Sequence, residues 1–282
     1  MVGVGNQMRT NNHLLPSADL INRVIAVENA YSVSRIRVLQ SLPGNPVGIE
    51  VREIGDNAVA LMAKNFPNPN FNRVAGLNGK QVKEVAPLVR WYRDNEVAPR
   101  FEILPREGDG ELGRELSRLG LYPSEFHTAL VRDVSPVPDV RSAALVQVTD
   151  TARMDAFLDA YIAGWKIPDG AGFKRNVSAG WLNRPGWSLY FARVDGKPAA
   201  EGILYVRDGV GYLADASCDP GFRGRGLHAA LLARRIAEAA KAGADLVCSG
   251  AAYLSTSHRN MERAGMRILF NRAIWTDLNL ES

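Results

Sequence analysis

Apolar residues recur with two different periods along this chain, and these periods predict both helices and strands. A spacing of three to four residues, as on one face of a helix, is found in 20–27, 85–92, 154–165 and 227–236. Short apolar or alternating runs between turn-forming residues predict strands at 48–54, 57–63, 99–105, 124–134, 187–194, 199–207, 210–217 and 244–251. The pattern therefore predicts an α/β protein.

Several local signals refine this pattern. Ser17 is the expected N-cap of a first helix, and a second helical stretch follows it to about Leu42. Asp195-Gly196 and Asp208-Gly209 favour tight hairpin turns, so the three strands between 187 and 217 are expected to form an antiparallel meander. Glycine and proline interrupt 166–186, which is expected to be irregular, and 266–278 is expected to form two strands after a short helix.

The two halves of the chain end alike. "RELSRLGL" (114–121) aligns with "RNMERAGM" (259–266) at an offset of 145, and "FHTALV" (126–131) aligns with "FNRAIW" (270–275) at an offset of 144. A strand, a helix and a short strand precede each segment. This order predicts two copies of one unit, joined by a proline-containing linker, with domains at 1–138 and 139–282. The alternative is chance similarity between amphipathic helix ends.

Composition narrows the class of protein. The 282 residues are 46% hydrophobic and 23% charged, as in a globular protein of about two domains. A net charge of +4 and a pI near 9.1 suit a phosphate-bearing ligand. The chain lacks the dense Lys/Arg stripe of a dedicated nucleic-acid binder, so nucleic acid is not the expected partner.

The cysteines and the N-terminal segment bear on the cellular compartment. Cys218 and Cys248 lie in apolar stretches and form no CxxC motif, which predicts reduced thiols and no metal site. No run approaches 18 apolar residues, and no basic segment followed by an apolar run opens the sequence. A cytoplasmic location without membrane insertion is therefore expected.

The chemically distinctive segment is "CDPGFRGRGLHAALLARR" (218–235). Three glycines and two arginines lie among the six positions 221–226, directly before a predicted helix. The first N–H groups of a helix have no helical partner, glycine lets a ligand approach the backbone, and arginine binds phosphate in a bidentate manner. The segment matches neither GxxxxGK[ST] nor GxGxxG. It predicts a site for a pyrophosphate-sized anion; the alternative is a glycine-rich connection with solvated arginines.

At these residues the sequence resembles the GNAT superfamily of acyl-CoA-dependent N-acyltransferases. Their loop, [Q/R]-x-x-G-x-[G/A], is similar to Arg223–His228, and their later "Y-E-K-L-G-F" element is similar to 261–266. The resemblance covers about 145–277, and the first half looks like a degenerate second copy, as in tandem members. It implies two GNAT-like α/β domains, each with a mixed, mostly antiparallel sheet flanked by helices. It also implies acetyl-CoA or another short acyl-CoA as co-substrate, no metal, and a small-molecule amine as acceptor.

The resemblance also implies which residues bind the coenzyme. The backbone of Ala216, Ser217 and Cys218 is expected to hold the pantetheine arm and to stabilise the thioester oxygen. Asn260 is a further candidate for the pantetheine, or else faces solvent, and Ser257 is either near the coenzyme or a helix N-cap. The pyrophosphate is expected over Phe222, Arg223, Gly224, Arg225, Gly226, Leu227 and His228.

Two departures from the family pattern affect the predicted catalysis. His228 stands where glycine or alanine is usual, and it either contacts the coenzyme or points outward. Met261 stands where the family often has a tyrosine that protonates the leaving thiolate, and a thioether has no proton to donate. Asp215 is the predicted base, with a capping or solvated aspartate as the alternative. Tyr253 is the predicted acid, with Ser257 and His258 as further candidates and a core tyrosine as the alternative.

Three functions follow for testing. The first is transfer of an acetyl or short acyl group from CoA to a small amine by direct attack in a ternary complex. The second is a non-catalytic acyl-CoA sensor or scaffold, suggested by Met261 and by the degenerate first half. The third is a nucleic-acid-associated protein, suggested only by the pI. The sequence leaves the acceptor and the oligomeric state open.

Overall fold

The computed structural model describes residues 12–277 except 67, 105, 107–109 and 141–143. In this part of the chain the helices are α1 (Ala18–Gln40), α2 (Val85–Asp94), α3 (Gly110–Arg118), α4 (Thr151–Trp165), α5 (Gly170–Trp181), α6 (Leu227–Lys241) and α7 (Thr256–Arg263). The strands are β1 (Ile49–Ile54), β2 (Ala58–Ala63), β3 (Arg73–Ala75), β4 (Phe101–Ile103), β5 (Leu121–Asp133), β6 (Leu145–Gln147), β7 (Trp187–Val194), β8 (Lys197–Arg207), β9 (Val210–Cys218), β10 (Leu246–Ala252) and β11 (Arg267–Asp277). Short 3₁₀ helices η1 (Asn12–Leu14), η2 (Gly79–Glu84) and η3 (Pro220–Phe222) complete the described elements.

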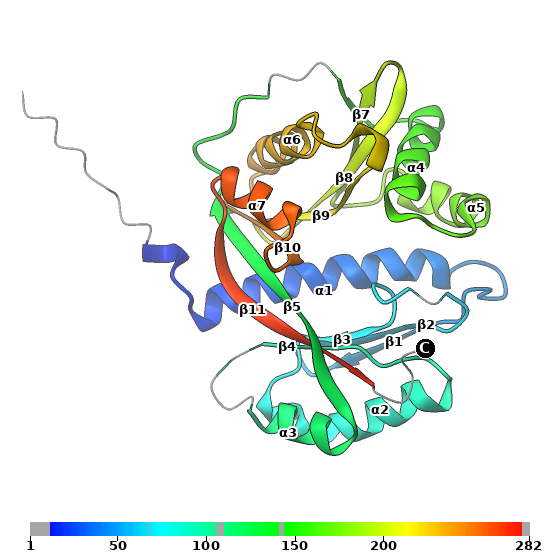
Figure 1. The fold of residues 1–282 in the computed structure, drawn as a ribbon, viewed down its shortest axis with the longest axis vertical. Coiled ribbons are helices and arrows are strands. Elements are labelled where there is room, and N and C mark those ends of the chain that lie inside the picture. Colours follow the sequence, from blue (N-terminus) through cyan, green and yellow to red (C-terminus); the bar gives the residue numbers. More distant parts are fainter. Residues whose placement is uncertain (1–11, 67, 105, 107–109, 141–143, 278–282) are drawn as a thin grey trace, which may run out of the picture.

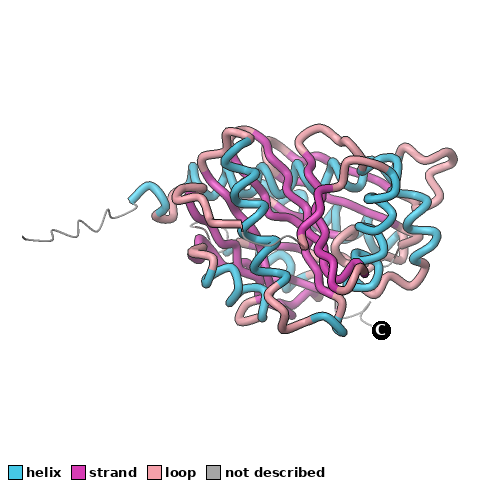
Figure 2. Tube along the Cα trace, turned by 90° about the horizontal axis from the view of Figure 1, so that it is seen from above, coloured by secondary structure: helices cyan, strands magenta, loops and turns pink. Residues whose placement is uncertain are grey.

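The strands form one mixed sheet. Its order of parallel and antiparallel pairs is nearly the same whether it is followed from the β1 edge or from the β6 edge. The order is β1-β2-β3-β4-β11-β5-β10-β9-β8-β7-β6. The parallel pairs are β3 with β4 and β9 with β10, and the other neighbours are antiparallel. Figures 1 and 2 show helices on both sides of this sheet. The predicted fold class, α/β with mixed, mostly antiparallel pairing, is confirmed, although a single sheet runs through both halves.

The halves are joined because each gives its last strand to the other. β5 pairs with β10 of the second half, β11 pairs with β4 of the first, and β5 and β11 pair with each other in the middle. His127 lies opposite Arg272 in that central pair. Their separation in sequence, 145, equals the offset of the first pair of matching segments and exceeds by one the offset of the second pair, which contains His127. An approximate twofold relation centred on this pair follows from the topology.

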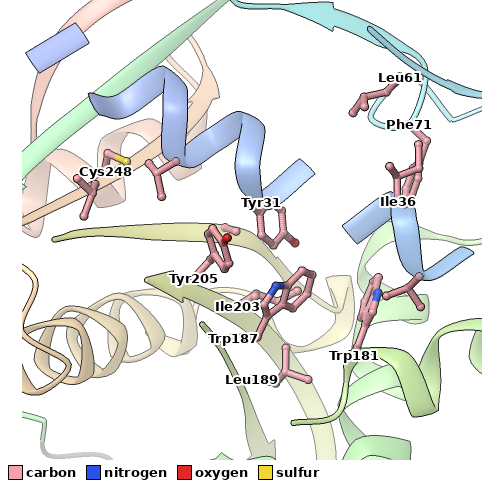
Figure 3. Packing of buried hydrophobic residues seen from close by; sticks show 14 of the residues in the cluster. Tyr31, Ile36, Leu61, Phe71, Trp181, Trp187, Leu189, Ile203, Tyr205 and Cys248 are labelled. Carbon is pink, nitrogen blue, oxygen red and sulfur yellow. The ribbon is translucent and has the colours of Figure 1, made fainter. Parts of the chain in front are cut away.

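Helix α1 lies between the two halves and packs on both (Figure 1). Ser17 caps it as predicted, accepting a hydrogen bond from the Leu20 amide, and the helix runs without a break to Gln40. Tyr31 on this helix meets Trp187 and Tyr205 of the second half (Figure 3), while Ile36 and Leu39 share a core with β1 and β2 residues. Helix α1 thereby fixes the position of one half against the other.

Other helices cover the remaining sheet surfaces. Helix α6 packs on β8 and β9 through Leu231, Leu232 and Ile236, and α2 and α3 cover strands of the first half. Asp195 and Asp208, at positive φ, begin the predicted hairpin turns, each with the following glycine also at positive φ. No helix in the described ranges combines the length and apolar character needed to cross a membrane.

Three predictions about secondary structure were wrong. The second helical stretch expected to run to about Leu42 is part of the single helix α1, which ends at Gln40. The segment expected to be irregular contains α5, because Asp169 caps it and Phe173, Val177 and Trp181 form an apolar stripe at a spacing of four. The final segment is the single long strand β11 instead of two strands, because it pairs with β5 along nearly its whole length. Pro87 lies in the first turn of α2, where proline is tolerated because its N–H would have no acceptor within the helix.

Candidate functional site

The loop between β9 and α6 leaves a helix N-terminus open. Gly224 and Gly226 have φ of 76° and 74°, and Gly226 is the N-cap of α6 without any side-chain hydrogen bond. A Cβ atom built on either glycine would meet nothing within 4 Å. Asp219 accepts from the Gly221 amide and so caps only the short η3 turn. The first N–H groups of α6 therefore face open space beside Arg223 and Arg225, which is the geometry that binds phosphate.

A cavity of about 610 Å³ lies over this loop, and we call it the loop cavity. It contains every residue that the sequence predicted for the coenzyme, drawn from β9, the loop, α6 and α7. Those residues are Ala216, Ser217, Cys218, Phe222, Arg223, Gly224, Arg225, Gly226, Leu227, His228, Ser257 and Asn260. Helix α4 adds Gly164 and Trp165, which the sequence reasoning had not assigned to the site.

Two irregularities of β9 open the sheet beside this cavity. The parallel pairing of β9 with β10 ends at Tyr212 and Cys248, although both strands continue beyond these residues. On its other side β9 has a bulge, since Gly202 lies opposite Ala216 and Ile203 opposite Ala214, leaving Asp215 as the extra residue. A bulge turns a side chain away from the regular alternation of a strand.

Arg235 of α6 fastens this bulge from the opposite side. It is fully buried, and its Nη1 donates to the carbonyl oxygens of Ile203 and Ala214 at 3.1 and 2.8 Å. A Cβ atom at Gly202 would lie 2.9 Å from the Arg235 guanidinium carbon, so only glycine leaves room for it. The bulge that displays Asp215 is therefore held by the helix whose N-terminus forms the loop.

A second cavity of about 380 Å³ lies where the two halves meet, and we call it the charged cavity. Its charged side chains come from α1, β3, β4, β9, α6 and β11: Glu28, Arg35, Arg73, Glu102, Asp215, Arg235 and Arg272. The two cavities share Trp165, Ala216, Ser255 and Ser257. A ligand in the loop cavity and a ligand in the charged cavity would thus meet at these four residues.

Asp215 is held at one oxygen and open at the other. Its Oδ2 accepts from Arg35 Nη1 at 2.6 Å, from the Tyr31 hydroxyl at 2.9 Å and from the Tyr161 hydroxyl at 3.2 Å. Burial, reinforced by the Asp215 charge, raises the pKa of both tyrosines, so they remain protonated donors. Its Oδ1 has no hydrogen-bond partner among the described residues and is available to a ligand in the charged cavity.

The rest of the charged cavity is a network of ion pairs across the halves. Arg272 donates to Glu28 and to Glu102 at 2.7 Å each, and Arg73 donates to Glu102 at 2.8 Å. Burial alone would raise the pKa of Glu102, but Arg73 and Arg272 outweigh it and lower this pKa to about 2. This network ties α1 and β4 of the first half to the exchanged strand β11.

Sequence reasoning missed the contribution of α1 to this cavity. Glu28, Tyr31 and Arg35 lie three and four residues apart, in phase with the apolar residues Val24 and Val27. Charged residues on the buried face of a helix were the available signal, because such groups are rarely buried without a partner.

Glu201 of β8 was also missed. Its side chain is fully buried, and its Oε1 accepts from the Ser217 hydroxyl at 2.8 Å and from Trp165 Nε1 at 3.1 Å. Burial raises the pKa of this carboxyl to about 8. An acidic residue inside the apolar strand 199–207 was the signal that the sequence offered.

The residues that the sequence offered as proton donors differ in their position relative to the two cavities. Tyr253 lines neither cavity; it is 48% exposed, and its ring lies 5.4 Å from that of His258. His258 is buried, and its Nδ1 accepts from the Leu254 amide. Met261 lines the charged cavity, as its position in the family motif implies. Ser255, and not Ser257, is the N-cap of α7, since its hydroxyl accepts from the His258 amide.

His228 points inward toward α7 and not outward from the loop. Its Nε2 lies 3.5 Å from the Ser257 hydroxyl, and its Nδ1 lies 3.3 Å from Asn260 Nδ2. Burial, followed by the positive charge of Arg235, lowers the pKa of His228 to about 4. The ring is therefore neutral near pH 7.

Comparison with known proteins gives a family match for part of the chain and similar folds for the whole of it. Residues 132–254 match the family model described as an acetyltransferase (GNAT) domain. Among solved structures, a GCN5-related N-acetyltransferase from Kribbella flavida has a TM-score of 0.61 at 13% identity, covering 91% of this chain and 95% of its own. One from Sphaerobacter thermophilus has a TM-score of 0.57 at 15% identity, with coverages of 93% and 94%. No curated protein sequence matches the chain significantly.

A further similar structure is a tandem GNAT protein from the clavulanic acid biosynthesis pathway. Its TM-score is 0.57 at 13% identity, and the match covers 93% of this chain and 97% of that one. At such identities the similarity concerns the fold. A segment that lies mostly in the second half thus matches the GNAT family model, and the fold of the whole chain is similar to that of GNAT proteins of comparable length.

Proposed function

We propose that the protein transfers an acetyl or other short acyl group from CoA to the amine of a small molecule, by direct attack in a ternary complex. The observation that carries this proposal is the open N-terminus of α6 in a cavity that meets a second, charged cavity. The loop cavity would hold acyl-CoA, and the charged cavity would hold the acceptor amine.

The residues of the loop cavity suit the coenzyme. The free N–H groups of α6 and the guanidinium groups of Arg223 and Arg225 supply donors for a pyrophosphate. The open space at Gly224 and Gly226 admits the phosphates close to the backbone. When bound, acyl-CoA supplies an activated acyl group. The edge of β9 from Asp215 to Cys218 has no ladder partner on the β10 side, so its backbone is available to the pantetheine arm.

The charged cavity suits an amine. An amine attacks a thioester only in its neutral form, so a nearby group must accept its proton. Asp215 Oδ1 has the required freedom, and the three donors on Oδ2 fix the direction of the carboxylate. We infer that Asp215 binds the amine and takes up its proton, directly or through water, as the new C–N bond forms.

We further propose that the first half, about residues 1–138, is a degenerate copy that has lost coenzyme binding and now builds the acceptor site. The nearly symmetric strand order and the central His127–Arg272 pair support the duplication. Glu28, Arg35, Arg73 and Glu102 support the role, because these first-half residues line the charged cavity.

The test combines binding with turnover. Calorimetry should show CoA binding, and release of the free thiol from acetyl-CoA should depend on an added primary amine from a broad panel. Binding of acyl-CoA without transfer to any amine would replace this proposal with the second candidate, a non-catalytic acyl-CoA sensor. Met261 in the usual tyrosine position is the observation that favours that alternative. Absence of CoA binding would contradict both.

A further inference from the structure

The junction of the two cavities identifies the groups that can contact the reacting thioester. This step rests on the proposed function, since the thioester must lie where the coenzyme and the acceptor meet. Four residues line both cavities. Trp165 directs its N–H to Glu201, and Ala216 has no polar side chain. The Ser255 hydroxyl accepts from the His258 amide as the cap of α7 and keeps its own proton, but no imidazole ring is hydrogen-bonded to it among the described residues. The fourth residue is Ser257.

A chain of hydrogen-bonding groups leads to the Ser257 hydroxyl. Arg263 Nη1 donates to Asn260 Oδ1 at 2.9 Å. The amide nitrogen of Asn260 lies 3.3 Å from His228 Nδ1, and His228 Nε2 lies 3.5 Å from Ser257 Oγ. Ser257 and Asn260 are three residues apart on α7, so both reach the same side of the helix, where His228 enters from α6.

Which atoms donate and which accept in this series of hydrogen bonds follows from its first member, Arg263. Because Arg263 occupies the oxygen of Asn260, the amide nitrogen is the atom that faces His228, and Nδ1 must accept. The neutral ring then has its proton on Nε2 and directs it to Ser257 Oγ. The proton of Ser257 itself stays free for another acceptor. A hydroxyl whose oxygen accepts a hydrogen bond is a stronger donor.

We propose that Ser257 donates a hydrogen bond to the sulfur of the departing CoA and that His228 and Asn260 position it for this role. As the N–C bond forms and the C–S bond breaks, sulfur leaves with the electron pair as a thiolate. Ser257 keeps its proton and stabilises this charge, and the proton released by the amine later neutralises the thiolate through solvent. The arrangement explains two departures at once, since His228 replaces a small residue and Ser257 lies one turn before Met261, which cannot donate.

The experiment measures the pKa of the thiol in enzyme-bound CoA from the ultraviolet absorbance of the thiolate. Ser257→Ala should raise this pKa by about one pH unit, because a hydrogen bond to a charged group is lost. Affinity for desulfo-CoA, which lacks the sulfur, should stay unchanged. His228→Ala should raise the thiol pKa by a smaller amount, and His228→Gln, which retains a donor, should restore it. Turnover of Ser257→Ala should fall by about 10- to 100-fold.

The alternatives give different results. An unchanged thiol pKa in both Ser257→Ala and Ser257→Cys, or an equal loss of affinity for CoA and desulfo-CoA, would overturn the role of Ser257. A raised thiol pKa in Tyr253→Phe, with none in Ser257→Ala, would assign the donor to Tyr253. We expect Tyr253→Phe to leave the thiol pKa unaltered, because Tyr253 lines neither cavity. A wild-type protein that binds no CoA would contradict the proposed function itself.

Discussion

The two halves of the molecule use the same strand–turn–helix order to opposite effect. Between β3 and α2 the chain caps the short 3₁₀ helix η2, which leads directly into α2: Asn78 accepts from the Lys80 amide, and Gln81 accepts from the Asn78 amide, in a capping box. Helix α2 itself follows η2 with Glu84 at its N-cap and no side-chain cap of its own. Between β9 and α6 no side chain caps the helix, and Gly226 takes the N-cap position. The first turn satisfies its backbone donors internally, and the second leaves them for a ligand.

The glycines of the two turns show the same difference. A Cβ atom at Gly76, after β3, would lie 2.2 Å from the Asn57 carbonyl oxygen, so glycine is required there by close packing. At Gly224 and Gly226 the equivalent atom would meet nothing. All three have positive φ. An anion site therefore needs an uncapped helix end and empty space beside it, and glycine by itself does not provide either.

The largest expected effect comes from closing the second turn. Gly226→Asp should abolish CoA binding in calorimetry, because it places bulk and negative charge where phosphate must approach the backbone. Gly196→Asp is the matched control. Gly196 also has positive φ and open surroundings, but it lies in the β7–β8 hairpin turn, so the variant should lose some stability and bind CoA normally. Equal CoA affinity in both variants would refute the site.

The next effect concerns Asp215, which contacts α1 of the first half in the charged cavity. Asp215→Asn should lower kcat/KM by about 100-fold or more, while CoA binding stays intact. Tyr31→Phe removes one donor to Asp215 and leaves the carboxylate, so its effect should be much smaller. Because Arg35 loses its ion pair in Asp215→Asn, a thermal melt must accompany the assay. Full activity across pH would make Asp215 a structural residue.

The residues that line the loop cavity could be predicted from sequence because their signals are local. Gly224, Gly226 and the two arginines are contiguous, and their chemistry does not depend on distant residues. The charged cavity could not be predicted, since Glu28 and Arg35 reach Asp215 only after α1 packs across both halves. The exchange of β5 and β11 was hidden for the same reason: the repeat predicts two units but not which partner each last strand takes. Helix α5 was missed because its glycines outweighed the stripe of Phe173, Val177 and Trp181.

A smaller effect tests the buried carboxyl behind the loop cavity. Below pH 4.5 Glu201 is protonated in both folded and unfolded chains; between pH 4.5 and 8 only the folded chain keeps the proton. Its raised pKa therefore makes the folded state lose stability across this window, by up to about 1.4 kcal/mol per pH unit. The difference in unfolding free energy between Glu201→Gln and the wild type should therefore be larger, in favour of the variant, at pH 8 than at pH 4.5. Denaturant titrations at the two pH values measure this difference. A difference that does not vary with pH would show that Glu201 titrates normally.

The smallest effect tests whether the cap alone keeps the first half from binding the coenzyme. Asn78→Ala should cost about 1 kcal/mol of unfolding free energy, because it leaves the Lys80 amide without its acceptor. It should not add a second CoA site, because the first turn lacks both the arginine pair and the open space found at Gly226. Calorimetry should therefore give the same single-site binding as the wild type. A second binding event would mean that an open helix end suffices, and that the first half lost coenzyme binding through its cap alone.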